Sequence, residues 1–480
     1  MQLQAEGVIG EIRKLNYRDL LIFLIPVIIF SLYLAVFNPG IATYDTFNQL
    51  HQIASGQFTN WHPFFHTFIT MLCLSVYPGT ISVCILQILV FSTMWMVICK
   101  YHRDDELQIT KPFRLQVIVT LIICLIPINA LYSITLWKDI LFSYFLMFLC
   151  FLIKVMIDRN GTVDYRFVIF LSVVMAFVAQ LRGNGMYVVG VSLIIYCAYL
   201  FIKKNRKMAV LLPVLTITFI LLISSLNIVY DVHDNEKDAL MTKTAHMLAD
   251  YDLNLEIEDG DREKIHELLD ANRINDSYIP TGSDKIWAIS NYKLFDEAKG
   301  TYIGLAIKYS LRNPLHCLEY LFASSPMVWD IIRHDDWLGR PYYLSGESDR
   351  LQSDFEMYYT PRNFTPTHDY ENLSYANWGT PVFTVLNLLP LGIEAHFIPD
   401  TLFNSPALYM YLSIIILVGI HFITGSREIY LLYVPNLLNI LIVFASTPIQ
   451  DNRYLYANLL VCYMLVIILI GLRRYSTDES

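Results

Sequence analysis

Long apolar runs alternate with short polar segments along most of the chain. Each run is long enough, or nearly so, for a helix to cross about 30 Å of hydrocarbon. Two further apolar stretches, 64–77 and 381–398, are ambiguous. The pattern predicts an all-α fold, a polytopic transmembrane helix bundle with about 10–12 spans. The predicted spans are 20–37, 80–99, 116–134, 141–157, 167–181, 186–202, 208–230, 405–424, 429–448 and 455–472.

The polar segments between the runs differ in charge, and this difference predicts which side of the membrane each one faces. Cytoplasmic loops carry an excess of Lys and Arg, and basic clusters occur at 13–18, 100–114, 159–166, 203–207, 427 and 473–474. If all of them are cytoplasmic, both termini are cytoplasmic and the protein is a multi-pass protein of the cell membrane. Neither 64–77 nor 381–398 is then a single full crossing; each would be re-entrant or lie along the interface. The segments that face outward are 38–63, 135–140, 182–185, 231–404 and 449–454.

Composition supports a membrane protein and adds one domain to this scheme. Hydrophobic residues make up 55% of the 480 residues and charged residues only 16%, with a mean hydropathy of +0.44. Residues 231–380 hold 27 Asp and Glu against 14 Lys and Arg, whereas the remainder holds 16 against 20. We therefore expect a small, mainly helical and acidic extracytoplasmic domain at 231–380. It would separate an N-terminal transmembrane module (1–230) from C-terminal transmembrane helices (381–480).

Several classes of protein are disfavoured by the same residues. The chain has no basic stripe of the kind that binds nucleic acid. Its eight cysteines form no CxxC motif and no Cys/His cluster, so we expect neither a disulfide framework nor a structural metal site. No cofactor is predicted.

Polar residues of chemical interest all fall in the short segments that are predicted to face outward. Asp45, just beyond the first span, has the chemistry of a general base, but taken alone an Asp at this position is better explained as a helix N-cap. Lys138 and Asp139 are either a phosphate contact with its orienting partner or a local ion pair. Arg182 either binds phosphate or extends along the helix to reach water. Arg453 suits bidentate recognition of a phosphate, or is simply a charge at a helix end.

Two histidines begin the ambiguous stretch 64–77. His62 and His66 have the i, i+4 spacing of a metal-binding pair, but no third ligand is evident and a zinc site needs at least three. A phosphate contact by His62 is the alternative that we favour over a metal. An interfacial histidine of the aromatic belt is equally compatible with the sequence.

These segments together resemble the GT-C superfamily of integral-membrane glycosyltransferases, which use polyprenyl-phosphate-linked sugars. The arrangement is most similar to a bacterial branch related to the protein O-mannosyltransferase and aminoarabinose-transferase type. The resemblance covers nearly the whole chain in order, through short motifs. These are Tyr44-Asp45, Trp61-His62-Pro63, Lys138-Asp139 and a Pro-x(n)-Arg-Tyr signature at Pro448 to Tyr454 before the final span.

The resemblance implies roles for particular residues. The family's first-loop Asp is the catalytic base, and this role carries over to Asp45. The family's acidic doublet is absent because Thr46 follows Asp45, so Asp139 is the alternative base. The donor phosphate would be bound by His62, Lys138, Arg182 and Arg453, and the substrate would be lined by Tyr44, Trp61, Asn184 and Tyr454.

The implied reaction is an inverting transfer on the outer face of the membrane. The donor would be a polyprenyl-monophosphate-linked sugar, and the acceptor a cell-wall polysaccharide or another surface glycan. Three alternatives from other classes remain: a polysaccharide polymerase, a flippase or transporter of polyprenyl-linked glycans, and a non-catalytic scaffold. A transporter would need polar residues near the bilayer midplane, whereas the predicted spans are nearly free of charge.

Overall fold

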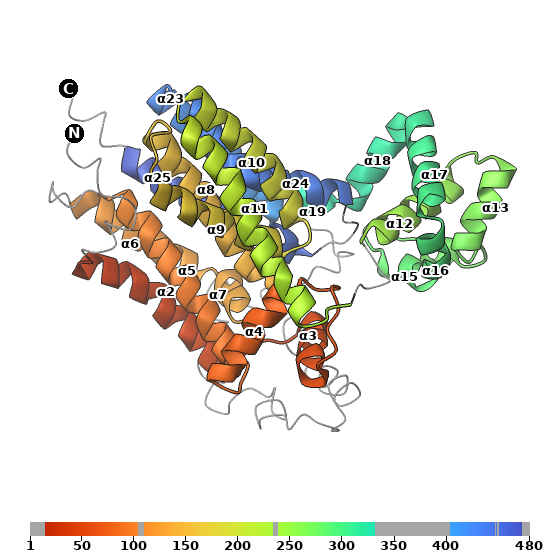
Figure 1. Cartoon of the computed structure of the whole chain (residues 1–480), viewed down its shortest axis with the longest axis horizontal. Helices are drawn as coiled ribbons and strands as arrows, with labels where there is room; N and C mark the ends of the chain where they lie inside the picture. The colour runs from red at the N-terminus through yellow and green to blue at the C-terminus, as the bar shows by residue number, and fades with distance from the viewer. Residues whose placement is uncertain are drawn as a thin grey trace.

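The computed structural model describes residues 15–103, 110–233, 239–331, 404–446, 448 and 451–472. Within these ranges the chain forms α-helices and short 3-10 helices, and no β-strand (Figure 1). The all-α prediction is therefore confirmed. The ambiguous stretch 381–398 and residues 332–380 of the predicted outer domain lie outside the described residues.

The apolar runs form a helix bundle. Eight helices among the described residues are long and apolar enough to cross a membrane, which identifies a multi-pass membrane protein. Two of the eight begin with a 3-10 segment, η1 (Arg427–Tyr433) or η2 (Asn452–Leu455). The helices of the bundle are α2 (Tyr17–Val36), α5 (Ile81–Tyr101), α6 (Thr110–Leu125), α7 (Pro127–Ser133), α8 (Lys138–Asp158), α9 (Tyr165–Leu181), α10 (Gly185–Ile202), α11 (Arg206–Val229), α23 (Pro406–Thr424), α24 (Val434–Ser446) and α25 (Tyr456–Leu472).

The structure shows that the predicted span 116–134 is not one straight helix. This run is two helices, α6 and α7, which meet at an angle of 72°. The break lies at Pro127, whose ring removes a backbone donor and disfavours helical geometry in the residue before it. Ile126 accordingly has an extended backbone, with φ −73° and ψ 113°. The run 167–181 also forms a helix, α9, but one shorter than the eight.

The stretch 64–77 forms α4 (Phe64–Val76), a helix of 13 residues. At 1.5 Å per residue such a helix is about 20 Å long, which is too short to cross the hydrocarbon unaided. The Thr80 hydroxyl, just before α5, donates to the carbonyl of Pro39, just after α2, at 3.3 Å. The chain between α2 and α5 therefore leaves and returns to the same end of the bundle. This geometry agrees with the prediction that 64–77 is not a single full crossing.

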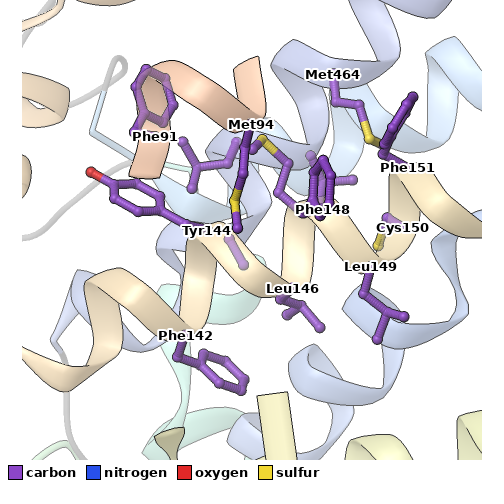
Figure 2. Close-up of a cluster of buried hydrophobic side chains, with 14 of the residues drawn as sticks. Phe91, Met94, Phe142, Tyr144, Leu146, Phe148, Leu149, Cys150, Phe151 and Met464 are labelled. Carbon is purple, nitrogen blue, oxygen red and sulfur yellow. The ribbon is translucent and has the colours of Figure 1, made fainter. Parts of the chain in front are cut away.

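Helix α8 forms the centre of the bundle. In its apolar window 94% of the residues are buried inside the protein, against 17% for α11 on the periphery. Figure 2 shows side chains of α8 projecting in several directions, from Phe142 to Phe151, beside Phe91 and Met94 of α5 and Met464 of α25. A helix that is hydrophobic on all sides belongs inside a bundle. Its first residues, Lys138 and Asp139, are consequently held at a fixed central position.

A second helical unit follows α11 and has a hydrophobic core of its own, centred on residues such as Leu248, Phe295 and Tyr302. Figure 1 shows it beside the bundle. It contacts the bundle through Phe322 and Phe444, whose rings lie edge to face with centroids 5.2 Å apart. Its helices are α12 (Ala239–Asn254), α13 (Asp259–Leu268), α14 (Ile274–Ser277), α15 (Asp284–Ala288), α16 (Tyr292–Glu297), α17 (Lys299–Arg312), α18 (Pro314–Ser324) and α19 (Pro326–Trp329).

Charged side chains join the helix ends at one end of the bundle. Buried Asp19, at the start of α2, pairs with Arg103 and lies 3.4 Å from the ammonium of Lys100 at the end of α5. Lys203, after α10, pairs with Glu428 of η1 at 2.5 Å. These contacts involve the basic clusters that the sequence analysis assigned to the cytoplasm. The described parts of the segments 38–63, 135–140, 182–185 and 449–454, which were predicted to face outward, meet at the other end.

Candidate functional site

Polar side chains from four separate parts of the chain form one cluster at this second end of the bundle. Asp45 belongs to the first turn of α3 (Tyr44–Ser55), and Lys138 and Asp139 are the first two residues of α8. Arg182 directly follows α9, and Arg453 belongs to η2. Their ion pairs also include one residue that the sequence analysis did not assign. We call the six residues the ionic network: Asp45, Lys138, Asp139, Arg182, Asp451 and Arg453.

Arg453 is held on two edges and on its faces. Its Nη1 lies 2.8 Å from Asp45 Oδ2 and its Nε lies 2.8 Å from Asp451 Oδ2. The guanidinium stacks over the indole of Trp137 at 4.7 Å and over the ring of Tyr454 at 5.1 Å. Such a planar, multiply paired guanidinium has one orientation. Arg453 is therefore more than a charge at a helix end.

Asp139 and Arg182 form the deeper part of the network. Asp139 is fully buried, and its Oδ1 lies 3.2 Å from Arg182 Nε. Arg182 also donates from Nη1 to the carbonyl of Tyr454 at 3.1 Å, and its guanidinium lies 4.4 Å over the Tyr454 ring. Because the Arg182 side chain is buried among these partners, it is not a solvent-exposed charge at the end of α9.

Lys138 connects the two parts. Its ammonium lies 3.3 Å from Asp45 Oδ2 and 3.7 Å from Asp139 Oδ2. The contact with Asp139 is the local pair of neighbours foreseen from the sequence, but the contact with Asp45 spans 93 residues. The network as a whole holds three carboxylates and three cations. Its formal charge is therefore zero, and each cation already has at least one carboxylate partner.

Asp45 is not the N-cap of its helix. Thr43 occupies that position, and its backbone N–H donates to Thr46 Oγ1 at 3.1 Å. The Thr46 hydroxyl in turn donates to the carbonyl of Leu136 at 3.0 Å, and the Trp137 indole donates to Thr43 Oγ1 at 2.7 Å. These bonds attach the start of α3 to the segment before α8. The Asp45 side chain remains about a quarter exposed, so it can meet a ligand.

The surrounding charges set the protonation of the outer part of the network. Burial alone would raise the pKa of Asp45, but Arg453 and Lys138 outweigh burial and hold this pKa well below its usual range. Burial, together with the ammonium of Lys138, lowers the pKa of His62 to about 3. At neutral pH the site therefore presents an ionised carboxylate and a neutral imidazole. His62 itself is buried, with 3% of its surface exposed.

The second histidine of this segment lies behind the first. His66 is buried on α4, and its Nδ1 lies 3.2 Å from Oε1 of Gln49, whose amide donates to Thr67 at 3.0 Å. With this amide orientation Nδ1 carries the proton. No group of three or more His, Cys, Asp and Glu side chains in the described part of the chain is arranged to hold a metal ion.

The four residues predicted to line a substrate differ in their contacts and in their distance from the ionic network. Tyr454 packs on both arginines of the network, and the Asn184 amide donates to Asn439 Oδ1 at 2.8 Å. Trp61 is 42% exposed, and its ring lies near that of His62. Tyr44 is the first residue of α3, and nothing is described of its side chain.

Sequence reasoning missed two members of this site. Asp451 was quoted as part of the final motif but received no role, although it lies two residues before Arg453 and pairs with it. Trp137, next to Lys138, has no role predicted from the sequence, whereas in the structure its ring stacks against the Arg453 guanidinium. The sequence did offer one signal: each of the two residues lies within two positions of a cation that already had an assigned role. Only the fold shows that these side chains point toward it.

Comparison with known proteins gives one match. No curated protein and no solved structure matches the chain. A family model described as "Family of unknown function (DUF6020)" matches residues 53–294, just over half of the chain. The matched region includes Lys138, Asp139 and Arg182, while Asp45 lies before it and Arg453 after it. The chain belongs to this family of unknown function, DUF6020.

Proposed function

We propose that this protein is an inverting membrane glycosyltransferase that moves a sugar from a polyprenyl-monophosphate-linked donor to an acceptor on the outer face of the membrane. The observation that carries the proposal is the ionic network. It brings three carboxylates, of which Asp45 and Asp451 are partly exposed, and three cations together at the end of a bundle of apolar helices. A lipid-anchored phosphate would present its head group near the ends of such membrane-spanning helices.

In the proposed reaction an acceptor hydroxyl attacks the anomeric carbon of the donor sugar. Asp45 accepts the hydroxyl proton as the new C–O bond forms, and the electron pair of the old C–O bond leaves with the phosphate. Asp45 is ionised at neutral pH and can therefore accept a proton, although the two cations that lower its pKa also make it a weaker base. Asp139 is a weaker candidate for the base, since it is fully buried and faces Arg182.

The departing polyprenyl phosphate would be stabilised by Arg453 and Lys138, with Arg182 behind them. These cations are already fixed by their carboxylate partners and by the rings of Trp137 and Tyr454. Groups that are fixed before the reaction need little reorganisation when charge develops on the leaving group. One such contact typically lowers the barrier by about two to four kcal/mol. His62, neutral and buried beside them, would donate or accept a hydrogen bond without adding charge.

The sidedness of the site is also part of the proposal. The basic residues near Lys100 and Lys203 lie at the end of the bundle opposite the ionic network, and the positive-inside rule assigns that end to the cytoplasm. The network and the acidic helical unit α12–α19 would then face outward. An acceptor polymer outside the cell could reach Asp45 from this side. The acceptor that we propose is a cell-wall polysaccharide or another surface glycan.

The distribution of charge in the spans argues against a transporter. Every Asp, Glu, Lys and Arg in the described bundle helices lies within about five residues of a helix end. Even buried Lys154 of α8 is in the last turns of its helix, where it pairs with Asp158. Transport sites usually place polar groups near the bilayer midplane. The described helices offer none of these charged groups there.

Analysis of lipid-linked intermediates in a deletion strain tests the proposed function. We expect one polyprenyl-monophosphate sugar to accumulate, and wild-type protein but not Arg453→Ala to restore its consumption. Accumulation of a lipid-pyrophosphate oligosaccharide would instead identify a polysaccharide polymerase. If no lipid-linked sugar changes, the glycosyltransferase proposal is wrong.

A further inference from the structure

The ionic network has no free cation to offer an incoming phosphate. Arg453 pairs with Asp45 and Asp451, Arg182 with Asp139, and Lys138 with Asp45 and Asp139. A sugar-phosphate-lipid donor is a phosphodiester and carries one negative charge. Adding it to the neutral network would leave one uncompensated negative charge in a largely buried place. Such a charge is costly where the surroundings are apolar.

The carboxylate with the fewest cation partners is the one that can most easily give up its charge. Asp139 lies near three cations, at 3.2, 3.7 and 3.9 Å, and Asp45 contacts Arg453 and Lys138. Within the described residues, Asp451 has an ion pair only with Arg453. If the donor phosphate binds the Nε side of the Arg453 guanidinium, it displaces Asp451 from that side. Asp451 then no longer has an ion-pair partner among the described residues.

The charges around Asp451 favour a proton there. Its own segment contributes Arg453 and Tyr454, and Arg182, which follows α9, reaches the same segment. Helix α8 contributes Asp139 and Lys138, and α3 contributes Asp45; α24 and α25, which also pack on η2, contribute no charged side chain. Burial raises the pKa of Asp451, and Asp139 and Asp45 act in the same direction. The Arg453 guanidinium opposes them, as does the Arg453 backbone N–H, which donates to Asp451 Oδ1 at 3.0 Å. Removal of Arg453 from Asp451 by a phosphate would raise this pKa further.

We propose that the site takes up one proton together with the phosphodiester donor, and that Asp451 holds this proton and passes it to the departing phosphate. The inference rests on the proposed function, because it concerns the same donor. It adds Asp451 as a further catalytic residue and identifies a singly charged phosphodiester as the substrate class.

The proposed step conserves charge and protons. In the loaded site Asp451 is protonated, so two carboxylates and the phosphodiester balance three cations. The acceptor oxygen bonds to the anomeric carbon as its proton moves to Asp45. The bond from the anomeric carbon to the phosphate oxygen breaks, and that oxygen receives the proton of Asp451. The product is a monoanionic phosphate monoester, and the site is neutral before and after transfer.

Binding of a farnesyl methyl phosphate diester to the purified full-length protein tests the proton uptake. This probe carries one charge that does not titrate near neutral pH. Calorimetry in buffers of different ionisation enthalpy should show about one proton taken up per diester between the pKa of Asp451 in the free protein and its higher pKa in the complex. Because the bound state holds the extra proton, the Kd should rise about tenfold per pH unit in that range. In Asp451→Asn the diester should bind without proton uptake and with a Kd that does not change with pH.

Asp252→Asn is the matched control, because Asp252 is an ion-paired aspartate of the outer helical unit. It should behave as the wild type. In transfer assays Asp451→Asn should keep a donor KM at or below the wild-type value while kcat falls roughly 10²-fold, and Asp451→Glu should recover part of the rate.

The outcomes separate this inference from the proposed function. Diester binding and sugar transfer without proton uptake would overturn the role of Asp451 and leave the glycosyltransferase proposal intact. Persistent uptake in Asp451→Asn would assign the proton to another group and also overturn it. A protein that neither binds the diester nor consumes a lipid-linked sugar would refute both.

Discussion

Replacement of Arg453 by Lys is the sharpest test of the ionic network. The substitution keeps the charge but removes the planar guanidinium that contacts Asp45 and Asp451 at 2.8 Å each and stacks on Trp137. A single ammonium on a flexible stem can keep one of these two pairs in the same geometry, and it cannot stack as a plane. The protein should still fold, because the local charge balance is unchanged.

The expected loss follows from the contacts. If the guanidinium supplies one directed contact to the departing phosphate, its loss raises the barrier by about two to four kcal/mol, which is roughly 30-fold to 10³-fold in kcat. Arg453→Ala should be worse still, since Asp45 keeps only Lys138 and Asp451 loses its ion pair with Arg453. A buried charge that loses its partner costs several kcal/mol of stability as well.

The assay is the initial rate of sugar transfer from a polyprenyl-monophosphate donor by purified protein, with kcat and KM determined separately. Arg166→Lys is the matched control, because Arg166 is an exposed arginine whose guanidinium contacts only its neighbour Tyr165 among the described residues. It should retain wild-type kinetics. Wild-type kcat in Arg453→Lys, or an equal loss in Arg166→Lys, would refute the reasoning.

Three further predictions concern the base, the outer unit and the topology. Asp45→Asn should lower kcat by roughly 10²–10⁴-fold with an unchanged melting temperature, because Thr43 and not Asp45 caps the helix; full activity there together with an inactive Asp139→Asn would move the base to Asp139. Burial lowers the pKa of His246 to about 4, so the folded state favours its neutral form, and the contribution of His246 to stability should be constant above pH 6.5 and fall by about 1.4 kcal/mol per pH unit between pH 6.5 and about 4. His246→Gln should flatten this dependence in thermal unfolding between pH 5 and 7, and an identical acid limb in the variant would contradict it. In a cysteine-free background, Asn272→Cys should react with an impermeant thiol reagent on intact cells and Lys204→Cys only after permeabilisation; the reverse pattern would place the ionic network in the cytoplasm.

The helices could be predicted from the sequence because hydrophobic length decides a membrane span almost alone. Two apolar runs do not form simple spans, and in each case the cause is local and cannot be deduced from the length of the run. Pro127 breaks the run 116–134 at Ile126, and the averaged hydrophobicity of the run conceals that break. The helix α4 has the composition of a span but ends after 13 residues, and the basic clusters were needed to argue that it does not cross.

The site could be predicted in part, for a different physical reason. Polar residues at the ends of apolar helices are few, so the convergence of Asp45, Lys138, Arg182 and Arg453 followed once their segments were assigned to one side. Which of these charged residues pair with each other could not be predicted in the same way. The pairing of Lys138 with Asp45 depends on how α3 approaches α8, and the role of Asp451 depends on which way its side chain turns. The spacing of residues along the chain specifies neither the approach of α3 to α8 nor the direction of the Asp451 side chain.

The order of the charged residues along the chain has a consequence for insertion into the membrane. Before the last helix is made, the chain already holds two carboxylates and two cations of the network, namely Asp45, Asp139, Lys138 and Arg182. The last helix then adds Asp451 and Arg453, which pair with each other at 2.8 Å. An unpaired charge beside hydrocarbon costs several kcal/mol. A nascent chain that carries equal numbers of carboxylates and cations can therefore pack its early helices in the membrane before the last helix is made. The completed site then forms by docking of an already neutral segment.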